Sequence, residues 1–153
     1  MNLLSTAILT TRSDNNDFDI HSVDFLVDGV PLYSATNAHH ASLAGRFSSL
    51  WVAEANENKV KVLLGESPAD LPDNRIGLFV CSRCGSLACG GITFRLTRSA
   101  NAVRWSKFAY ECDNDYTDKE FARYSSIGPF TFNFVAYREA IEGAAASFSG
   151  RGP

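Results

Sequence analysis

Apolar and polar residues alternate along several stretches of the chain, which is the pattern of half-buried strands. The first stretch, 18–27, precedes Asp28-Gly29, a pair typical of a type I′ turn because both positions need a positive φ. Pro31 lacks an N–H, so the second strand of this hairpin is expected to be very short or to lie at a sheet edge. The other predicted strands are 60–64, 76–80, 92–97, 103–111 and 130–134. Among them 76–80 is an unbroken apolar run, as expected of a central strand buried on both faces.

A helical spacing of apolar residues appears in two places. Leu43, Phe47, Leu50 and Trp51 fall at i, i+4, i+7 and i+8, which predicts a helix that begins near Asn37. The same spacing over 134–148 predicts a C-terminal helix. A capping box at Thr117–Glu120 predicts a further short helix that ends at Tyr124.

These elements together predict an α+β fold. We expect five or six mostly antiparallel strands, a helix after the first hairpin, a C-terminal helix, and helices packed on one side of the sheet. The length of 153 residues suits a single domain over 1–153, with 1–15 and 149–153 loosely ordered. A hydrophobic content of 45% with 20% charged residues excludes wholesale disorder.

The chain gives little sign of a membrane or secretory role. Its longest apolar run falls well short of the roughly 18 residues that a spanning helix needs. The first residues, MNLLSTAILTT, have no preceding basic residue and no clean cleavage site, and so make a poor signal peptide. We therefore expect a soluble cytoplasmic protein with no membrane partner.

The charges are unevenly distributed around a net charge of −3. No acidic residue lies between Asp73 and Glu111, and the basic residues inside that interval are Arg75, Arg83, Arg95, Arg98, Arg104 and Lys107. These residues either form a basic surface that binds phosphates or an acidic partner, or are the solvated faces of strands. The sequence pI of about 5.5 is far from the values above 9 typical of dedicated nucleic-acid binders, so nucleic acid is the weaker partner hypothesis.

A cysteine cluster is the main chemical feature. Cys81-x-x-Cys84-Gly85 is the turn that a zinc knuckle uses, and Cys89 follows after four residues. A closed structural Zn²⁺ site takes four ligands. Cys112 is the predicted fourth, because a hairpin between 92–98 and 103–111 returns it to the turn. His39, His40 and Asp113 are the alternative fourth ligands.

Three interpretations of the cluster remain open. Closely spaced intracellular cysteines commonly bind metal, although free cysteines also pack as small hydrophobes. The third interpretation is a thiol-dependent oxidoreductase that uses Cys81 and Cys84. A redox Cys-x-x-Cys normally begins a helix, whose N-terminus lowers the pKa of the nucleophile, whereas strands and glycines surround this one.

Other catalytic patterns are missing from the sequence. It contains no Gly-x-Ser-x-Gly, His-Glu-x-x-His, phosphate loop or dinucleotide fingerprint. Asp24 and Asp28 are interpreted as outward strand and turn residues, and the acidic stretch 113–118 as a polar loop. Trp51 and Trp105 are expected to be core anchors. We therefore expect a non-catalytic domain that binds another protein, with an immunity-like role suggested by analogy.

One stretch of the chain has the pattern of a known family. The run LLGESPADLPDNRIGLFVCSRCGSLACGGITFRL, followed by VRWSKFAYE, resembles a family of small uncharacterised bacterial proteins with a Cys-x-x-Cys-Gly-Asp-x-x-Cys-Gly turn and a Trp-containing strand. The matching positions are Leu64-Gly65-Glu66, Arg75, Cys81, Cys84, Gly85, Cys89, Gly90 and Trp105. This chain has Ser86 where the pattern has Asp, and Cys112 is not part of the pattern. The resemblance implies an intact cysteine turn and assigns no activity.

Overall fold

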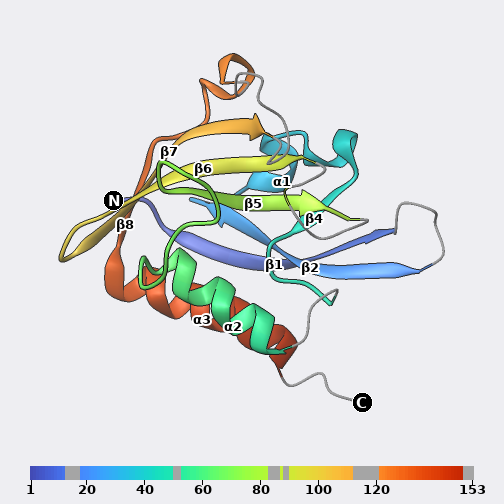
Figure 1. Cartoon of the computed structure of the whole chain (residues 1–153), viewed down its shortest axis with the longest axis horizontal. Coiled ribbons are helices and arrows are strands. Elements are labelled where there is room, and N and C mark those ends of the chain that lie inside the picture. The colour runs from blue at the N-terminus through green and yellow to red at the C-terminus, as the bar shows by residue number, and fades with distance from the viewer. Residues whose placement is uncertain (13–17, 50–52, 83–86, 88–89, 112–120, 150–153) are drawn as a thin grey trace.

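Eight antiparallel strands in two sheets, with three α-helices, make up the part of the chain that the structure describes. The structure is a computed structural model, and it describes residues 1–12, 18–49, 53–82, 87, 90–111 and 121–149 (Figure 1). The α+β class is thereby confirmed, with more strands than the five or six expected. No helix among these residues is long and apolar enough to cross a membrane.

The smaller sheet has the strand order β1-β2-β3 and the larger one the order β4-β5-β6-β7-β8. The strands are β1 (Leu4–Arg12), β2 (Asp19–Val27), β3 (Val30–Pro31), β4 (Leu43–Gly45), β5 (Arg75–Cys81), β6 (Gly91–Arg98), β7 (Ala102–Glu111) and β8 (Phe130–Asn133). The helices are α1 (Leu32–Ala35), α2 (Ala53–Leu63) and α3 (Phe134–Ser149), with short 3-10 helices at Ala38–Ala41 and Ala122–Tyr124. Helices α2 and α3 pack side by side on one side of the strands (Figure 1).

Backbone hydrogen bonds join the two sheets at two corners. At one corner the N–H of Asn2, just before β1, donates to the carbonyl of Thr131 in β8 over 2.7 Å. At the other, the N–H of Val23 in β2 donates to the carbonyl of Phe47, just after β4, over 3.0 Å. The strands therefore enclose one common core.

Aromatic side chains fill that core around Trp105 of β7, which is fully buried. The Trp105 ring stacks on Phe94 with centroids 4.4 Å apart and meets Phe25 edge-on at 5.8 Å. Its indole N–H donates to the hydroxyl of Tyr137 on α3, and that hydroxyl donates to the carbonyl of Leu63 at the end of α2. Burial raises the pKa of Tyr137. Trp105 thus ties both sheets to both long helices, which confirms it as a core anchor.

The first hairpin is confirmed. Asp28 and Gly29 have φ of 51° and 83°, as a type I′ turn requires. Strand β3 has two residues and lies at the sheet edge, as Pro31 predicted. The interpretation of Asp28 as a turn residue also holds, because its carboxylate accepts the amide of the Asn2 side chain and the N–H of Leu3. The hydrogen bond from Asn2 and, to a lesser extent, the one from Leu3 lower the pKa of Asp28.

Asp24 of β2 does not face outward as expected. It is buried, and its carboxylate accepts the N–H of Tyr33 over 3.0 Å. Burial raises the pKa of Asp24, and this hydrogen bond opposes the rise. Asp24 therefore fixes the start of α1 against β2 and belongs to the fold.

The strands around the cysteine turn are also confirmed. β5 is buried along nearly its whole length and lies between β4 and β6. β6 and β7 form the predicted antiparallel hairpin, and β8 leads directly into the C-terminal helix α3.

The helix predicted to begin near Asn37 and to run through Trp51 is wrong over the described residues, where only the 3-10 helix Ala38–Ala41 forms, while 50–51 lie outside them. Residues 43–45 form β4, which pairs with β5, and backbone bonds hold 46–49 against β2 and β5. At Gly45 an added Cβ would lie 2.3 Å from the carbonyl oxygen of Val23, so the approach of β4 to β2 requires glycine. The helical spacing of apolar residues arises because both strand faces are buried here, which removes the alternation.

The predicted strand over 60–64 is also wrong, because Val60 and Val62 lie on α2. Among the described side chains of α2, from 56 to 63, the fully buried ones are Asn56 and Leu63, which are two helical turns apart. A polar residue at an inward position hid the helical period, and the chance alternation of lysine with valine imitated a strand. Neither side-chain polar atom of Asn56 has a hydrogen-bond partner in the described part of the chain.

The remaining expectations concern the two ends of the chain and the capping box at 117–120. We expected 1–15 to be loosely ordered, yet 4–12 form β1 and pair with β2 at nine consecutive positions. The capping box at 117–120 and the residues from 150 onward lie outside the described residues. The predicted helix that ends at Tyr124 is represented there by the 3-10 helix Ala122–Tyr124.

Candidate functional site

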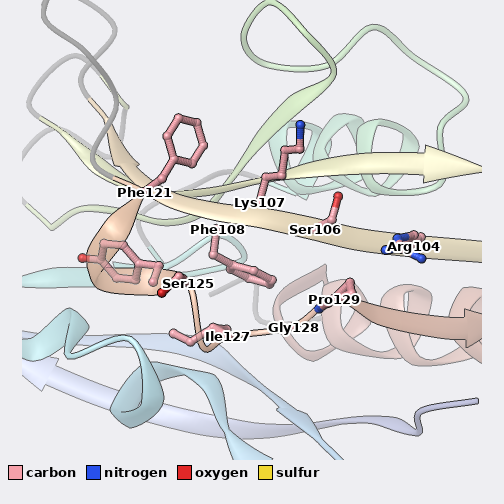
Figure 2. Close-up of a pocket in the computed structure, with 10 residues that line it drawn as sticks. Arg104, Ser106, Lys107, Phe108, Phe121, Ser125, Ile127, Gly128 and Pro129 are labelled. Atoms are coloured by element: carbon pink, nitrogen blue, oxygen red, sulfur yellow. The ribbon is translucent and has the colours of Figure 1, made fainter.

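A β-bulge in β7 shapes one wall of a surface pocket. The register between β6 and β7 shifts between Thr93 and Arg95, and Lys107 has a φ of 52°. Without the bulge, neighbouring side chains would alternate between the two faces of the sheet. Instead Trp105 and Phe108 are buried, and Ser106 and Lys107 both lie on the outer side (Figure 2). Bulges commonly redirect side chains in this way beside functional sites.

A buried arginine holds the bulge in place. Arg75 of β5 is 1% exposed, and its Nη2 donates to the carbonyl of Lys107 over 2.7 Å. Its Nε donates to Glu111 over 2.6 Å, and Nη2 also donates to the hydroxyl of Thr93 over 2.9 Å. The ring of Phe121 lies 5.2 Å from the guanidinium. The unusual backbone at Lys107 thus rests on a buried cation that is paired and hydrogen-bonded.

The bulge and the loop that follows the 3-10 helix Ala122–Tyr124 enclose a pocket of about 530 Å³, which we call the β7 pocket. Its lining residues are Arg104, Ser106, Lys107, Phe108, Phe121, Tyr124, Ser125, Ile127, Gly128 and Pro129. Figure 2 shows Arg104, Ser106 and Lys107 along the strand, with Ile127 and Pro129 on the facing loop. One side of the pocket is therefore cationic and the other is apolar.

The described lining of the β7 pocket offers groups that can bind an anionic and partly apolar ligand. Its described lining contains two cations, hydroxyl and aromatic side chains, but no carboxylate, histidine or cysteine. Its serines, Ser106 and Ser125, add hydroxyl groups that can donate or accept hydrogen bonds. Phe121 is 43% exposed, so an apolar surface is open to a ligand at the rim.

The predicted basic surface is smaller than the acid-free interval suggested. Arg75 is buried with Glu111, which makes the solvated-face interpretation wrong for this residue. Arg95 pairs with Asp73, and Arg98 lies 4.0 Å over the Phe134 ring. Arg104 and Lys107 both line the β7 pocket, while Arg83 lies outside the described residues.

The cysteine turn is described only in part. Cys81 is half-buried at the end of β5, and Cys84, Cys89 and Cys112 lie outside the described residues. Among the residues that are described, no group of three or more His, Cys, Asp or Glu side chains is placed to hold a metal ion. The zinc site and the redox pair therefore both remain predictions.

The register around the turn is nevertheless informative. Gly91 of β6 pairs with Val80 on one side and with Glu111 on the other. Val80 immediately precedes the first cysteine, and Glu111 immediately precedes the last. The strand ends that carry the cysteines therefore meet at one end of the sheet.

The glycines of the turn make room for side chains and backbone. A Cβ on Gly91 would lie 2.5 Å from the carbonyl oxygen of Phe79 and 2.7 Å from a methyl group of Leu87. Gly90 has a φ of 103°, and its Cβ would lie 2.2 Å from the Tyr110 hydroxyl. Among the described residues, these two glycines make room for Leu87, Tyr110 and the β5 backbone.

The histidines have different surroundings. His39 is exposed on the 3-10 helix before β4, with its ring 6.5 Å from that of Tyr33. This helix ends at Ala41, and Leu43, which begins β4, pairs with Cys81, so the helix leads into the strand that meets the first cysteine. The side chain of His40 lies outside the described residues. His21 hydrogen-bonds with Thr10 on β1 and is remote in sequence from the turn.

A second polar cluster gave no signal in the sequence. Arg46, 2% exposed, donates to Asp70 over 2.5 Å and to the carbonyl of Gly77 over 2.9 Å. Burial alone raises the pKa of Asp70, but the Arg46 charge and the hydrogen bonds outweigh it, so the pKa lies below its usual value. Burial and then the Arg46 charge lower the pKa of Lys59 to about 8. The cluster fastens the loop before β5 to β4 and α2, which is a structural role.

Comparison of the chain with protein-family models, curated proteins and solved structures found no match. The described residues form an α+β fold with an open surface pocket lined by cationic and aromatic side chains. The resemblance to bacterial cysteine-turn proteins stays a prediction. Function is therefore inferred from the β7 pocket and the cysteine turn themselves.

Proposed function

We propose that this chain is a non-catalytic binding domain that recognises an acidic segment of another protein in the β7 pocket. The observation that carries the proposal is the composition of the pocket wall. Arg104 and Lys107 are both exposed there, and no carboxylate belongs to the described lining. A pocket of about 530 Å³ is also within the range of about 300–1,000 Å³ typical of ligand sites.

The apolar side of the pocket defines the ligand further. An exposed ion pair contributes only about 0.2–1 kcal/mol, so two cations alone do not hold a peptide. Aromatic and aliphatic side chains supply more, because each buried apolar side chain contributes about 1.5–3 kcal/mol. The segment we propose therefore carries a large apolar residue among its acidic ones, to pack against Phe121 and Ile127.

A protein partner suits the charge distribution better than nucleic acid does. The net charge of the chain is −3, which opposes a polyanion, whereas a short acidic segment meets only the local cations. An immunity-like role belongs to this class, since small acidic single-domain proteins often act by covering a partner, and it rests on analogy. Both the cytoplasmic location and the non-catalytic role are part of the proposal.

The pocket can be tested with labelled peptides. The probe is a fluorescein-labelled peptide with one Trp among Glu residues, and its counterparts have Glu replaced by Gln or Trp replaced by Ser. We expect the double variant Arg104→Gln/Lys107→Gln to bind the probe about 2- to 30-fold more weakly in fluorescence anisotropy, as two lost surface ion pairs would give. Both counterpart peptides should bind the native protein more weakly than the probe.

The matched control is the double variant Arg12→Gln/Lys61→Gln, which removes the same charge at exposed positions on β1 and α2. It should bind the probe as the native protein does. Equal weakening in both double variants would reduce the effect to net charge and contradict a pocket. Saturable binding that neither double variant changes would also contradict it.

We also propose that Cys81, Cys84, Cys89 and Cys112 hold a structural Zn²⁺ ion. The pairing of Gly91 with both Val80 and Glu111 supports this, because it joins the strand ends next to the first and last cysteines. His39 is the alternative fourth ligand, since its helix precedes the strand that pairs with Cys81. In this role the metal would fasten the ends of β5, β6 and β7 together.

Metal content and chelation test this site. We expect about one zinc per chain by mass spectrometry of the untagged protein. Chelation should lower the melting temperature without unfolding the chain at room temperature, because β5, β6 and β7 are paired with one another independently of the turn. A Cys84→Ser variant should lose zinc, and a Ser86→Ala variant in the same turn should keep it.

The thiol-dependent oxidoreductase is the alternative function of the same turn. If the purified protein contains no zinc and chelators do not change its melting temperature, the metal site is excluded. Rapid alkylation of Cys81 or Cys84 with a lowered thiol pKa would then favour the redox pair, whereas slow alkylation until unfolding would indicate packed thiols.

A further inference from the structure

Strand β1 is an open sheet edge. It is nine residues long and, among the described strands, pairs only with β2, through an uninterrupted register from Leu4 to Arg12. Such an edge presents unpaired N–H and C=O groups to any strand that approaches it. In Figure 1 the far end of the β1–β2 ribbon extends beyond the ends of the other strands.

The middle of this edge lacks the features that usually prevent pairing between molecules. Natural edges are commonly protected by charged side chains, proline, bulges, or a helix or loop that covers them. Helix α3 contacts β1 but leaves residues 5–8 exposed. No charged side chain, proline or bulge occurs in β1 before Arg12, which pairs with Asp19. Residues 5–8 are exposed at four successive positions, so neither face is covered there, and Ile8 is 50% exposed.

The backbone hydrogen bonds identify which groups face outward. The carbonyl of Leu3 accepts the N–H of Asp28, so Leu3 faces β2. The N–H of Asn2 donates to Thr131 in the opposite direction. Because the direction alternates along a strand, the outward residues of β1 are Leu4, Thr6, Ile8, Thr10 and Arg12.

We propose that β1 pairs antiparallel with β1 of a second copy of this chain, about a two-fold axis at Ile8. Ile8 then faces Ile8 of the partner subunit, and Thr6 faces Thr10 of the partner subunit. All of these residues point their N–H and C=O groups outward, so each pair exchanges two hydrogen bonds. The two small sheets become one continuous six-stranded sheet in a closed, symmetric dimer.

The sequence of β1 favours a second copy as the occupant. Read in both directions from Ile8, the strand places Ala7 against Leu9, Thr6 against Thr10 and Ser5 against Thr11. Apolar residues thus meet at the axis, hydroxyl residues meet beside it, and no like charges oppose each other. An uncharged edge offers no charge complement to an acidic or basic partner strand. The proposal is independent of the β7 pocket.

The contact between the two β1 strands is small, so the affinity of the dimer is expected to be low. A single added strand supplies mainly backbone hydrogen bonds and a few apolar contacts at the centre, between the two Ile8 side chains and between Ala7 and Leu9. Interfaces of that size belong to weak, reversible assemblies. We therefore expect a dimer with a dissociation constant in the micromolar range, populated as the protein concentration rises.

Sedimentation velocity over a range of concentrations tests the dimer. The native chain should move from monomer to dimer, and Ile8→Lys should stay monomeric because two lysines would meet at the axis. Thr6→Pro should also stay monomeric, since it removes an outward N–H and leaves the ladder to β2 intact. The control Val135→Lys changes an exposed apolar residue on α3 and should dimerise as the native chain does.

Amide hydrogen exchange supplies a second readout that does not depend on these variants. In the native chain, protection at Thr6, Ile8 and Thr10 should rise with concentration, while protection of β2 stays constant. A native chain that remains monomeric at every concentration overturns the proposal. So does a dimer that persists in both β1 variants, one that Val135→Lys also abolishes, or open-ended aggregation in place of a dimer.

Discussion

Replacing Arg75 by Met should lower the free energy of unfolding by about 3–5 kcal/mol, because the change leaves Glu111 as a buried and uncompensated charge. The guanidinium of Arg75 is the ion-pair partner of Glu111 and also donates to the Lys107 carbonyl. The variant therefore loses the ion pair and the support of the β7 bulge together. Urea denaturation followed by circular dichroism measures the loss.

Two further variants separate the causes. Arg95→Met makes the same substitution on the neighbouring strand, where the ion pair with Asp73 is partly exposed, and should cost less than about 1 kcal/mol. Arg75→Met/Glu111→Leu removes both charges and should recover most of the stability, since an apolar pair of similar volume often replaces a buried ion pair without loss. If Arg75→Met loses no more free energy of unfolding than Arg95→Met does, the buried ion pair does not stabilise the sheet as we expect.

Replacing Trp105 by Ala should cost about 3–5 kcal/mol, the usual range for a large aromatic side chain in a core. Trp105 contacts rings from both sheets and bonds to the Tyr137 hydroxyl over 3.2 Å. The substitution therefore opens a cavity where the two sheets and α3 meet. The midpoint of urea unfolding should fall accordingly.

Two further variants, Trp105→Phe and Tyr137→Phe, separate the contribution of ring packing to this stability from that of the hydrogen bonds. Trp105→Phe keeps most of the ring contacts and should lose less than the alanine variant. Tyr137→Phe removes the hydroxyl that donates to Leu63 over 2.7 Å, and should cost about 1 kcal/mol. The control Val135→Ala, at an exposed position of α3, should change stability little. A Trp105→Ala protein as stable as that control would mean that the core is organised around other side chains.

The central strands and the C-terminal helix were predictable because local pattern and tertiary environment agree there. The run at 76–80 is apolar at successive positions, and β5 is indeed covered on both faces. The first turn was predictable because Asp28-Gly29 meets a requirement for positive φ that few residue pairs satisfy.

The two errors of secondary structure have a common cause in burial. Over 43–48 the chain is buried at every position, so no alternation marks β4. In α2 the inward position is occupied by Asn56, a polar residue that conceals the helical period. Patterns of apolar residues report which positions are covered, and here the coverage comes from segments distant in the sequence.

The site was predictable in composition but not in geometry. The acid-free interval pointed to Arg104 and Lys107, yet nothing in it distinguished them from the buried Arg75. The bulge at Lys107 depends on Arg75, 32 residues earlier, and the facing wall comes from the loop at 121–129. The Arg46–Asp70 pair, 24 residues apart, likewise has no local signature.

The corner between Asn2 and Thr131 has a consequence for the order of folding. These residues are 129 positions apart, so during synthesis this corner cannot close until β8 has left the ribosome. The β1–β2 hairpin is local in sequence, so it can form much earlier. The ring of Phe25 in β2 cannot pack against Trp105 until β7 has been synthesised. A nascent chain therefore carries this hairpin with Phe25 uncovered until β7 and β8 have emerged, and the core can be enclosed only then.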